Sequence, residues 1–347
     1  MSGVSKAIVQ PLLSWYDAGH RDLPWRSEPA PYRVWVSEIM LQQTRVEAVR
    51  GYFSRWMNAL PDIPALAAAD EAVYTQLWEG LGYYSRVRNL HRAAVLLCEE
   101  YGGELPADYD RLLALPGVGE YTAGAVASIA FGLPVPAVDG NVLRVAARLD
   151  NDFTPITDAK FKKQTRERFA ALMPSDRPGD LNQSLMELGA TVCLPNGAPH
   201  CDDCPIQHLC EGFHRGNAAV LPLRAAKKAR RVENRTVLVV RCGQLVGLRQ
   251  RPKKGLLAGL WELPSLDGHL SPDELRAALT EMDWSVRKLL SLRPAKHIFT
   301  HVEWHMNGVY VELDAPAPAL TFVTPAELRD AYALPSAFRS FVSVLED

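Results

Sequence analysis

The apolar residues of this chain change their spacing part of the way along it. Between Tyr32 and Thr44 they recur at the three- and four-residue intervals of a helix, and from Arg235 onward they form short runs that indicate strands. We expect a helical domain over residues 1–216, a basic linker over 217–233 and a smaller α/β domain over 234–347. The other predicted helices cover residues 109–115, 121–131, 142–149, 272–282 and 325–345, and the predicted strands cover 236–242, 245–251, 260–266, 295–306 and 309–313.

A tight hairpin from Leu115 to Gly119 joins two of these helices. Proline fixes φ, and the glycines at positions 117 and 119 permit backbone shapes that are closed to other residues. Unpaired amides at such a turn and at the following helix start can hold a phosphate oxygen, so Gly117 and Gly119 are candidate phosphate contacts. An ordinary helical hairpin has the same Gly-x-Gly pattern. Asp139 is placed to cap the helix over 142–149.

Glu38 lies on the apolar face of its predicted helix, with Val34 and Leu41 at positions i−4 and i+3. A structural explanation is a buried glutamate paired with Arg45 or Arg88, or a helix turned so that Glu38 meets water. Burial, however, also disfavours a charged carboxylate. Glu38 can therefore hold a proton near neutral pH and act as a general acid.

Composition and charge limit the partners of the chain. It is 48% hydrophobic and 22% charged, as is ordinary for a globular protein. Residues 1–216 hold 20 basic and 26 acidic residues, so a contact with DNA in this half must be local. Residues 217–347 hold 18 and 14, with a basic cluster of Arg224, Lys227, Lys228, Arg230, Arg231 and Arg235. Such a run is either a solvated linker or a phosphate contact.

The sequence also predicts a cellular location. No apolar run approaches the roughly 18 residues that a membrane span needs. The segment from Met1 to Trp25 lacks the apolar core and cleavage site of a secretion signal. We therefore expect a cytoplasmic protein, associated with the nucleoid if it is bacterial, that does not bind a membrane.

Four cysteines within eighteen residues indicate one metal centre, because disulfides are rare in intracellular proteins. They are Cys193, Cys201, Cys204 and Cys210. With His200 and His208 nearby, zinc is one possible occupant. A 4Fe-4S cluster held by four thiolates is the other.

Aromatic and basic residues alternate in a further segment, Leu81 to His91. This composition suits a loop that wedges into a base stack and holds phosphates. A purely structural pair at Tyr83 and Tyr84 would look the same.

Taken in chain order, these motifs resemble a known family. LPGVGEYTAGAV followed by VDGNVLRVAARL resembles the helix-hairpin-helix DNA glycosylases, and the set SEIMLQQT, GLGYY, four cysteines and FTH is similar to the MutY-type adenine DNA glycosylases. The resemblance implies a helix-hairpin-helix catalytic domain with an iron-sulfur loop over 193–210, followed by a MutT-like (Nudix-fold) domain. The Nudix hydrolase signature of clustered glutamates is missing, so we expect no pyrophosphatase activity.

The resemblance also implies a function. Such an enzyme flips adenine out of double-stranded DNA, where it is paired with 8-oxoguanine or G, and hydrolyses its glycosidic bond. Glu38 then matches the general acid, and Asp139 matches the carboxylate that stabilises the sugar cation. The other implied roles are orientation of Asp139 by Asn141, an adenine pocket lined by Arg26 and Gln183, wedging by Gln43 and Tyr83, and contact with the oxidised guanine by Thr300 and His301.

One departure from the family pattern and two alternative functions remain. The family resemblance favours a 4Fe-4S cluster over zinc, although seven residues separate Cys193 from Cys201 where six are expected. A bifunctional glycosylase/lyase of the endonuclease III type needs an amine where this chain has Tyr121. A non-catalytic iron-sulfur DNA-binding protein would be expected to lack Glu38 or Asp139, and both are present. We expect a monomer.

Overall fold

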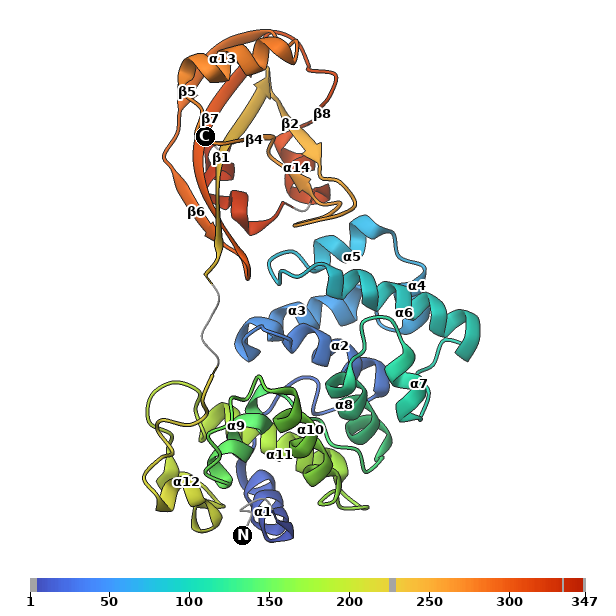
Figure 1. Ribbon diagram of the computed structural model, residues 1–347. Helices are drawn as coiled ribbons and strands as arrows, with labels where there is room; N and C mark the ends of the chain where they lie inside the picture. The colour runs from blue at the N-terminus through green and yellow to red at the C-terminus, as the bar shows by residue number, and fades with distance from the viewer. Residues whose placement is uncertain (1–4, 225–228, 333, 346–347) are drawn as a thin grey trace. The chain divides into compact units, whose positions relative to one another are not determined.

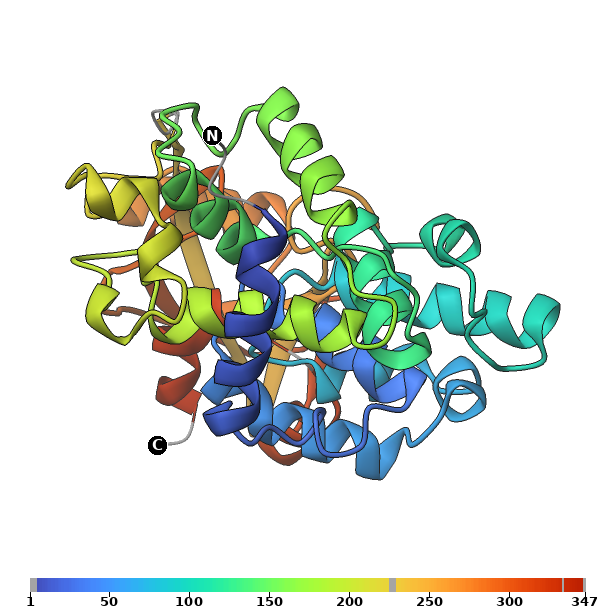
Figure 2. The ribbon, with the colours of Figure 1, turned by 90° about the horizontal axis from the view of Figure 1, so that it is seen from below.

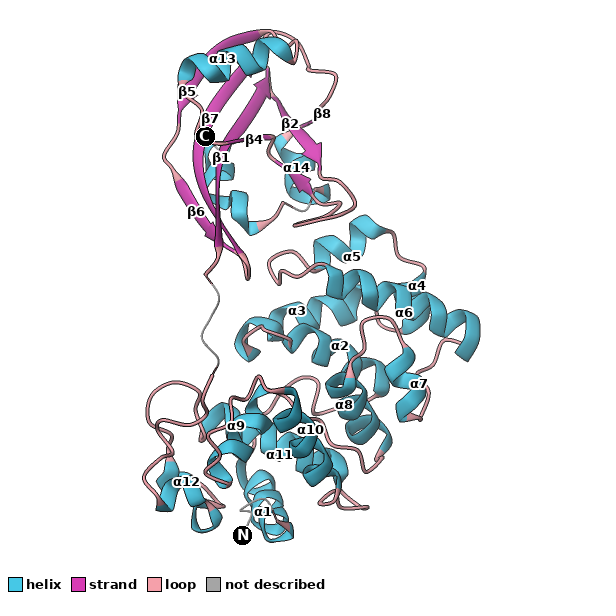
Figure 3. Ribbon diagram, in the orientation of Figure 1, coloured by secondary structure: helices cyan, strands magenta, loops and turns pink. Residues whose placement is uncertain are grey.

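The computed structural model describes residues 5–224, 229–332 and 334–345. Contacts between residues divide the chain into two compact units, which are described separately. The first contains residues 1–69 and 88–226, and the second contains residues 70–87 and 227–347. The first unit is helical, and every strand of the described residues belongs to the second (Figure 3).

The helices of the first unit are short and closely spaced along the chain (Figure 1). They are α1 (Val9–Gly19), α2 (Pro31–Leu41), α3 (Val46–Ala59), α4 (Ile63–Ala67), α6 (Ser85–Tyr101), α7 (Tyr109–Ala114), α8 (Glu120–Phe131), α9 (Gly140–Leu149), α10 (Ala159–Ala170), α11 (Pro178–Thr191) and α12 (Glu211–His214). None of the helices in the described ranges is both long and apolar enough to span a membrane.

One core of this unit joins the N-terminal helix to helices from the middle of the chain. Helix α1 packs against α11, which in turn packs against α8 and α9 (Figure 2). Leu12, Val145 and Leu185 are almost completely buried in this core. The partly buried Cys193, Cys204 and Cys210 pack against the same core, so the cysteine loop is anchored to it.

The hairpin and its helices confirm the prediction, whereas the end of α2 does not. Helices α7 and α8 flank the hairpin, and the side chain of Asp139 caps α9 by accepting hydrogen bonds from its first turn.

The helix expected to reach Thr44 ends at Leu41. Gln43 has a φ of 59°, which is outside the right-handed helical region, so it stops the helix.

The second unit contains a mixed sheet. Its elements are α5 (Glu71–Leu77), β1 (Arg231–Cys242), β2 (Leu245–Gln250), β3 (Trp261–Glu262), β4 (Ser265–Asp267), α13 (Pro272–Glu281), β5 (Val286–Ser291), β6 (Ala295–Ile298), β7 (Val302–Leu313), β8 (Thr321–Val323), α14 (Pro325–Ala331) and α15 (Arg339–Val342). The strand order is β3-β2-β1-β7-β5, with β4 paired to β1, β6 to β7 and β8 to β2. The long strands β1 and β7 are parallel, and the other pairs are antiparallel.

Both faces of this sheet are buried, because successive residues of β1 point to opposite sides. Val237 and Val239 pack towards α14, towards Phe338 in the short turn before α15, and towards Phe341 of α15. The residues between and after them, Leu238 and Val240, pack towards α13. A helical layer on each face therefore closes the core.

Two predicted elements of this unit are wrong in their extent. The strand expected over 295–306 is a hairpin of β6 and β7 with a turn at Phe299–His301. The helix expected over 325–345 is broken into α14, α15 and short 3-10 turns; Pro335, which lacks an amide hydrogen, lies just before the first of these turns. In addition, β1 begins at Arg231, five residues earlier than expected.

Candidate active site

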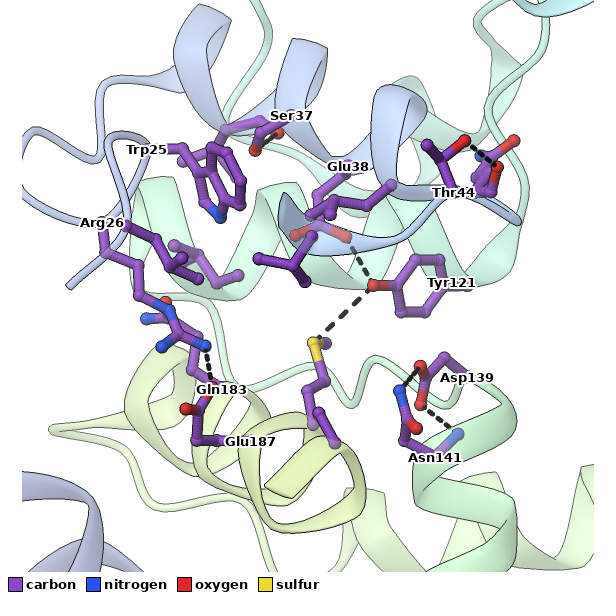
Figure 4. Close-up of a pocket in the computed structure, with 18 of the residues that line it drawn as sticks. Trp25, Arg26, Ser37, Glu38, Thr44, Tyr121, Asp139, Asn141, Gln183 and Glu187 are labelled. Atoms are coloured by element: carbon purple, nitrogen blue, oxygen red, sulfur yellow. Dashed lines mark hydrogen bonds and ion pairs between the residues drawn. The ribbon is translucent and has the colours of Figure 1, made fainter. Parts of the chain in front are cut away.

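A cavity of about 490 Å³ opens in the first unit, lined by residues of α2, α8, α9 and α11 (Figure 4). Its size falls in the range of pockets that take a small organic molecule such as a nucleobase. Its ionisable lining residues are Arg21, Arg26, Glu38, Tyr121, Asp139 and Glu187.

Helix α2 places Glu38 in this cavity with only 5% of its surface exposed, so the water-facing alternative is wrong. The Tyr121 hydroxyl, carried by α8, donates a hydrogen bond to Glu38 Oε2 at 2.5 Å. Burial raises the pKa of Glu38 to about 7, against the opposing effect of this hydrogen bond. The protonated form of Glu38 is therefore accessible near neutral pH.

Asp139 is stabilised differently, because it caps α9. Its Oδ1 accepts hydrogen bonds from the amides of Asn141 and Val142, both at 2.8 Å, and its Oδ2 accepts one from Asn141 Nδ2 at 2.7 Å. Burial raises the pKa of Asp139, whereas these three bonds act to lower it. The ionised form of Asp139 thus has three donors.

The two carboxylates share one cavity but differ in the groups that bind them. Glu38 has one hydroxyl donor and a pKa near 7. Asp139 has three donors at a helix N-terminus, whose dipole also favours an anion. A proton donor beside an anion suits cleavage of a glycosidic bond through an oxocarbenium-like transition state.

Helix α11 and the loop before α2 contribute an ion pair that closes another side of the cavity. The guanidinium of Arg26 lies 2.8 Å from Glu187 Oε2, and that of Arg21 lies 2.7 Å from Glu187 Oε1. Burial acts to raise the pKa of Glu187, but the two arginines outweigh it and lower the pKa to about 2. Gln183, one helical turn before Glu187, also lines the cavity.

Trp25, Met186 and Glu187 are among the lining residues that sequence reasoning missed. Met186 contacts the same hydroxyl as Glu38, with its Sδ 3.6 Å from the Tyr121 oxygen. The helical spacing would have revealed Glu187, because it follows the predicted Gln183 by four residues. Trp25 adjoins the predicted Arg26, and its aromatic neighbours suggested only a core position.

A chain of hydrogen bonds runs from Asp139 to the cysteine loop. Asn141, which bonds to Asp139, accepts a hydrogen bond at Oδ1 from Arg144 Nη2 at 2.8 Å. Arg144 Nε in turn donates to the carbonyl of Cys193 at 2.8 Å. Gly189 leaves room for Asn141, since a Cβ on Gly189 would lie 2.5 Å from Asn141 Cβ. The orientation of Asn141 is thus tied to the start of the cysteine loop.

The four predicted cysteines line one small cavity, between α9, α11 and the loop that follows. Burial raises the pKa of Cys204 to about 12, and the neighbouring thiols of Cys193, Cys210 and Cys201 also raise it. Arg148 Nη1 donates to Cys193 Sγ at 3.1 Å. Among the described residues, no three His, Cys, Asp or Glu side chains form a group already arranged to hold a metal ion.

The predicted phosphate hairpin has the backbone that its glycines require. Gly117 has a φ of +77°, and a Cβ on it would lie 2.6 Å from Asn89 Cβ. Gly119 is the N-cap of α8 and has no atom near its Cβ position. The amides of the first turn of α8 follow it, so the hairpin meets the requirements of an anion site.

Both predicted wedge residues have left-handed backbones, with φ of 59° at Gln43 and 47° at Tyr83. Such strain in residues other than glycine is concentrated at functional sites. Tyr83 is 45% exposed and belongs by its contacts to the second unit. Its hydroxyl lies 2.6 Å from that of Thr300, so these two predicted residues meet, and His301 is next to them in the same turn.

Comparisons with known proteins find similar proteins for both parts of the chain. Residues 36–172 match the HhH-GPD superfamily of base excision DNA repair proteins, and residues 236–344 match the NUDIX domain. An adenine DNA glycosylase from Mus musculus is 38% identical over 97% of this chain and 77% of its own length. A solved thermostable thymine-DNA glycosylase is 27% identical, with a TM-score of 0.54 over 60% of this chain and 96% of its own. A trapped endonuclease III–DNA covalent intermediate is 26% identical, with a TM-score of 0.51 over 61% and 98%.

Proposed function

Because the chain belongs to the adenine DNA glycosylase family, enzymes that cleave N-glycosidic bonds in DNA repair, we propose that it removes adenine paired with 8-oxoguanine or with G. Glu38 is the general acid and Asp139 stabilises the sugar cation. The observation that supports these roles most directly is the cavity in which both carboxylates are held by different hydrogen bonds.

The base must leave the stack before it can react, because its reacting atoms are inaccessible in duplex DNA. The cavity then receives adenine, with Arg26 and Gln183 on its wall. Glu38 protonates a ring nitrogen, the bond from the base to the sugar breaks, and adenine leaves with the bonding electrons. Water adds to the sugar and completes the hydrolysis.

Asp139 stabilises the positive charge that develops on the sugar as this bond breaks. Three hydrogen bonds fix its carboxylate and favour its ionised form, and Asn141 supplies two of them. Asn141 therefore orients the anion. Arg144, which binds Asn141, keeps the amide turned towards Asp139.

The alternative of a bifunctional glycosylase/lyase is less well supported. That chemistry needs an amine that forms a Schiff base with the sugar. At the corresponding position α8 carries Tyr121, whose phenol has its pKa raised well above the usual range by burial and by the nearby carboxylates. A neutral phenol cannot form a Schiff base, so we propose a monofunctional enzyme that leaves an intact abasic strand.

Cys193, Cys201, Cys204 and Cys210 would hold a 4Fe-4S cluster, which we prefer to zinc. The donor set fits such a group, since four thiols converge on one cavity and raise one another's pKa values. When bound, the cluster supplies the positive metal charge that four neighbouring thiolates need in order to ionise together. The seven-residue spacing between the first two cysteines is taken up within their loop.

Lesion recognition is proposed to lie in the second unit. The Thr300 hydroxyl and the His301 ring offer a donor and an acceptor to the altered edge of 8-oxoguanine. Tyr83, which contacts Thr300, and Gln43 wedge into the duplex.

Gly117 and Gly119 hold a phosphate, and the basic residues of the linker add phosphate contacts. Of these, Lys227 and Lys228 lie outside the described residues.

We also propose that three parts of the chain have separate roles. The catalytic domain extends over 1–216, the linker over 217–233 and the recognition domain over 234–347. We propose a monomer in the cytoplasm that acts on double-stranded DNA.

Substitution of the proposed acid tests this function. Glu38→Gln keeps the shape of the side chain but cannot supply an acidic proton, so adenine excision from an A:8-oxoguanine duplex should fall by roughly 10²- to 10⁴-fold. Binding of the duplex should be nearly unchanged. Glu47→Gln, at a position 75% exposed on α3, is the matched control. Excision by Glu38→Gln within threefold of the parent protein would refute the assignment.

A further inference from the structure

The turn between β6 and β7 presents two exposed side chains at its tip. The amide of Phe299 donates to the carbonyl of Val302 at 2.8 Å, which closes the turn around Thr300 and His301. Both tip residues are exposed, whereas Phe299 is half-buried. The position of the tip thus depends on what holds Phe299.

The ring of Phe299 rests on a buried aromatic residue. It meets the ring of Trp304 edge-on, with the ring centres 4.9 Å apart and the planes at 73°. Trp304 has 0% of its surface exposed. Aromatic pairs in this geometry add about 0.5–1.5 kcal/mol to the effect of their buried area.

Trp304 is itself fixed by charged groups. The guanidinium of Arg235 lies 4.5 Å from the centre of its ring, and that of Arg251 lies 5.5 Å from it. Glu233 accepts a hydrogen bond from Trp304 Nε1 at 2.9 Å and another from Arg235 at 2.9 Å. Glu262, which is 1% exposed, pairs with Arg251. The ring therefore has one well-defined position.

The segment that enters β1 holds the backbone of the same turn. Arg230 Nε donates to the carbonyl of Phe299 at 3.2 Å, and the amide of Arg231 donates to the carbonyl of His301 at 3.1 Å. These bonds lie on either side of Thr300. The Arg231 side chain instead points to Glu233.

We propose that Arg230 and Trp304 are positioning residues that hold the Phe299–His301 turn in place and so set the selectivity for 8-oxoguanine. This inference rests on the proposed role of Thr300 and His301 as readers of the lesion. A turn that is already ordered loses less conformational freedom when it binds a base edge. Arg230 then contributes to specificity, unlike a residue that only contacts phosphate.

Two variants test this role by different routes. Arg230→Ala removes the bond to the turn, and Phe299→Leu removes the ring that rests on Trp304 without changing the net charge. Each should lower the ratio of excision rates on A:8-oxoguanine and A:G duplexes roughly 3- to 10-fold, as for the loss of one hydrogen bond or ring contact. Arg276→Ala is the matched control, since it removes the same charge from an exposed position on α13, and should leave the ratio within about twofold.

Epistasis distinguishes positioning from a separate contact. In the Thr300→Ala/His301→Ala background, Arg230→Ala should change the ratio no further, because the side chains it positions are missing. Thermal unfolding of each variant shows whether the domain remains folded, and a second measurement of the ratio by equilibrium binding does not depend on the chemical step.

The outcomes separate this inference from the proposed function. An unchanged ratio for Arg230→Ala and Phe299→Leu, with a reduced ratio for Thr300→Ala/His301→Ala, would overturn the positioning role and leave the reader in place. An unchanged ratio for all three would overturn the reader itself. Equal losses on both duplexes for Arg230→Ala would show that Arg230 only contacts phosphate.

Discussion

The pH dependence of adenine excision should respond to the hydroxyl of Tyr121. Glu38 acts in its protonated form, so the single-turnover rate should be constant at low pH and fall tenfold per unit above its pKa of about 7. The Tyr121 hydroxyl donates to the carboxylate at 2.5 Å and so stabilises the ionised form. Tyr121→Phe removes this donor, and the pKa of Glu38 should rise.

The size of the shift follows from the energy of that bond. A hydrogen bond to a charged group contributes about 1.5–3 kcal/mol, and one pKa unit corresponds to 1.36 kcal/mol. The inflection should therefore move up by about one to two units, to about pH 8–9. A loss of stabilisation of the sugar cation would lower the plateau of the profile and leave the inflection where it is.

The assay is single-turnover excision from an A:8-oxoguanine duplex between about pH 5.5 and 9.5. Ser37→Ala is the matched control, because Ser37 lines the same cavity but its hydroxyl donates to the carbonyl of Val34. Its inflection should stay at that of the parent protein. For Tyr121→Phe, the inflection could instead stay unchanged or move to lower pH. Either result would refute the role of this hydroxyl and the assignment of the fall in rate at high pH to Glu38.

Three further predictions concern the cofactor, the reaction class and the hairpin. The purified protein should be brown, with broad absorption at about 400 nm that Cys204→Ser weakens; a colourless protein with one zinc ion would contradict the cluster. Borohydride should trap no covalent complex with DNA, since Tyr121 supplies no amine, and strong trapping would place the protein in the bifunctional class. Gly117→Ala should lower the free energy of unfolding by roughly 1–2 kcal/mol or more, because its φ is +77° and its Cβ would meet Asn89, whereas Gly119→Ala, which only replaces one N-cap residue by a poorer one, should cost less. Equal stability of the two glycine variants in chemical denaturation would show that the hairpin can relax.

Local chemistry made several parts of this protein predictable from its sequence. The hairpin at Leu115–Gly119 and the cap at Asp139 are confirmed, because such turns and caps are formed by bonds between residues only a few positions apart. The apolar spacing around Glu38 correctly placed its side chain in the interior. The change to strand patterns likewise predicted the second, mixed α/β part of the chain.

The sequence did not reveal the partners that give these residues their properties. Glu38 and Tyr121 are 83 residues apart, and only the packing of α2 against α8 joins them. Nor did spacing reveal that Arg230 reaches the turn at Phe299, 69 residues further along. Local backbone preferences are set by a few neighbouring residues, so they can be read from a short stretch of chain. A pKa or a fixed turn depends on groups brought together from distant segments, so the tertiary structure alone decides it.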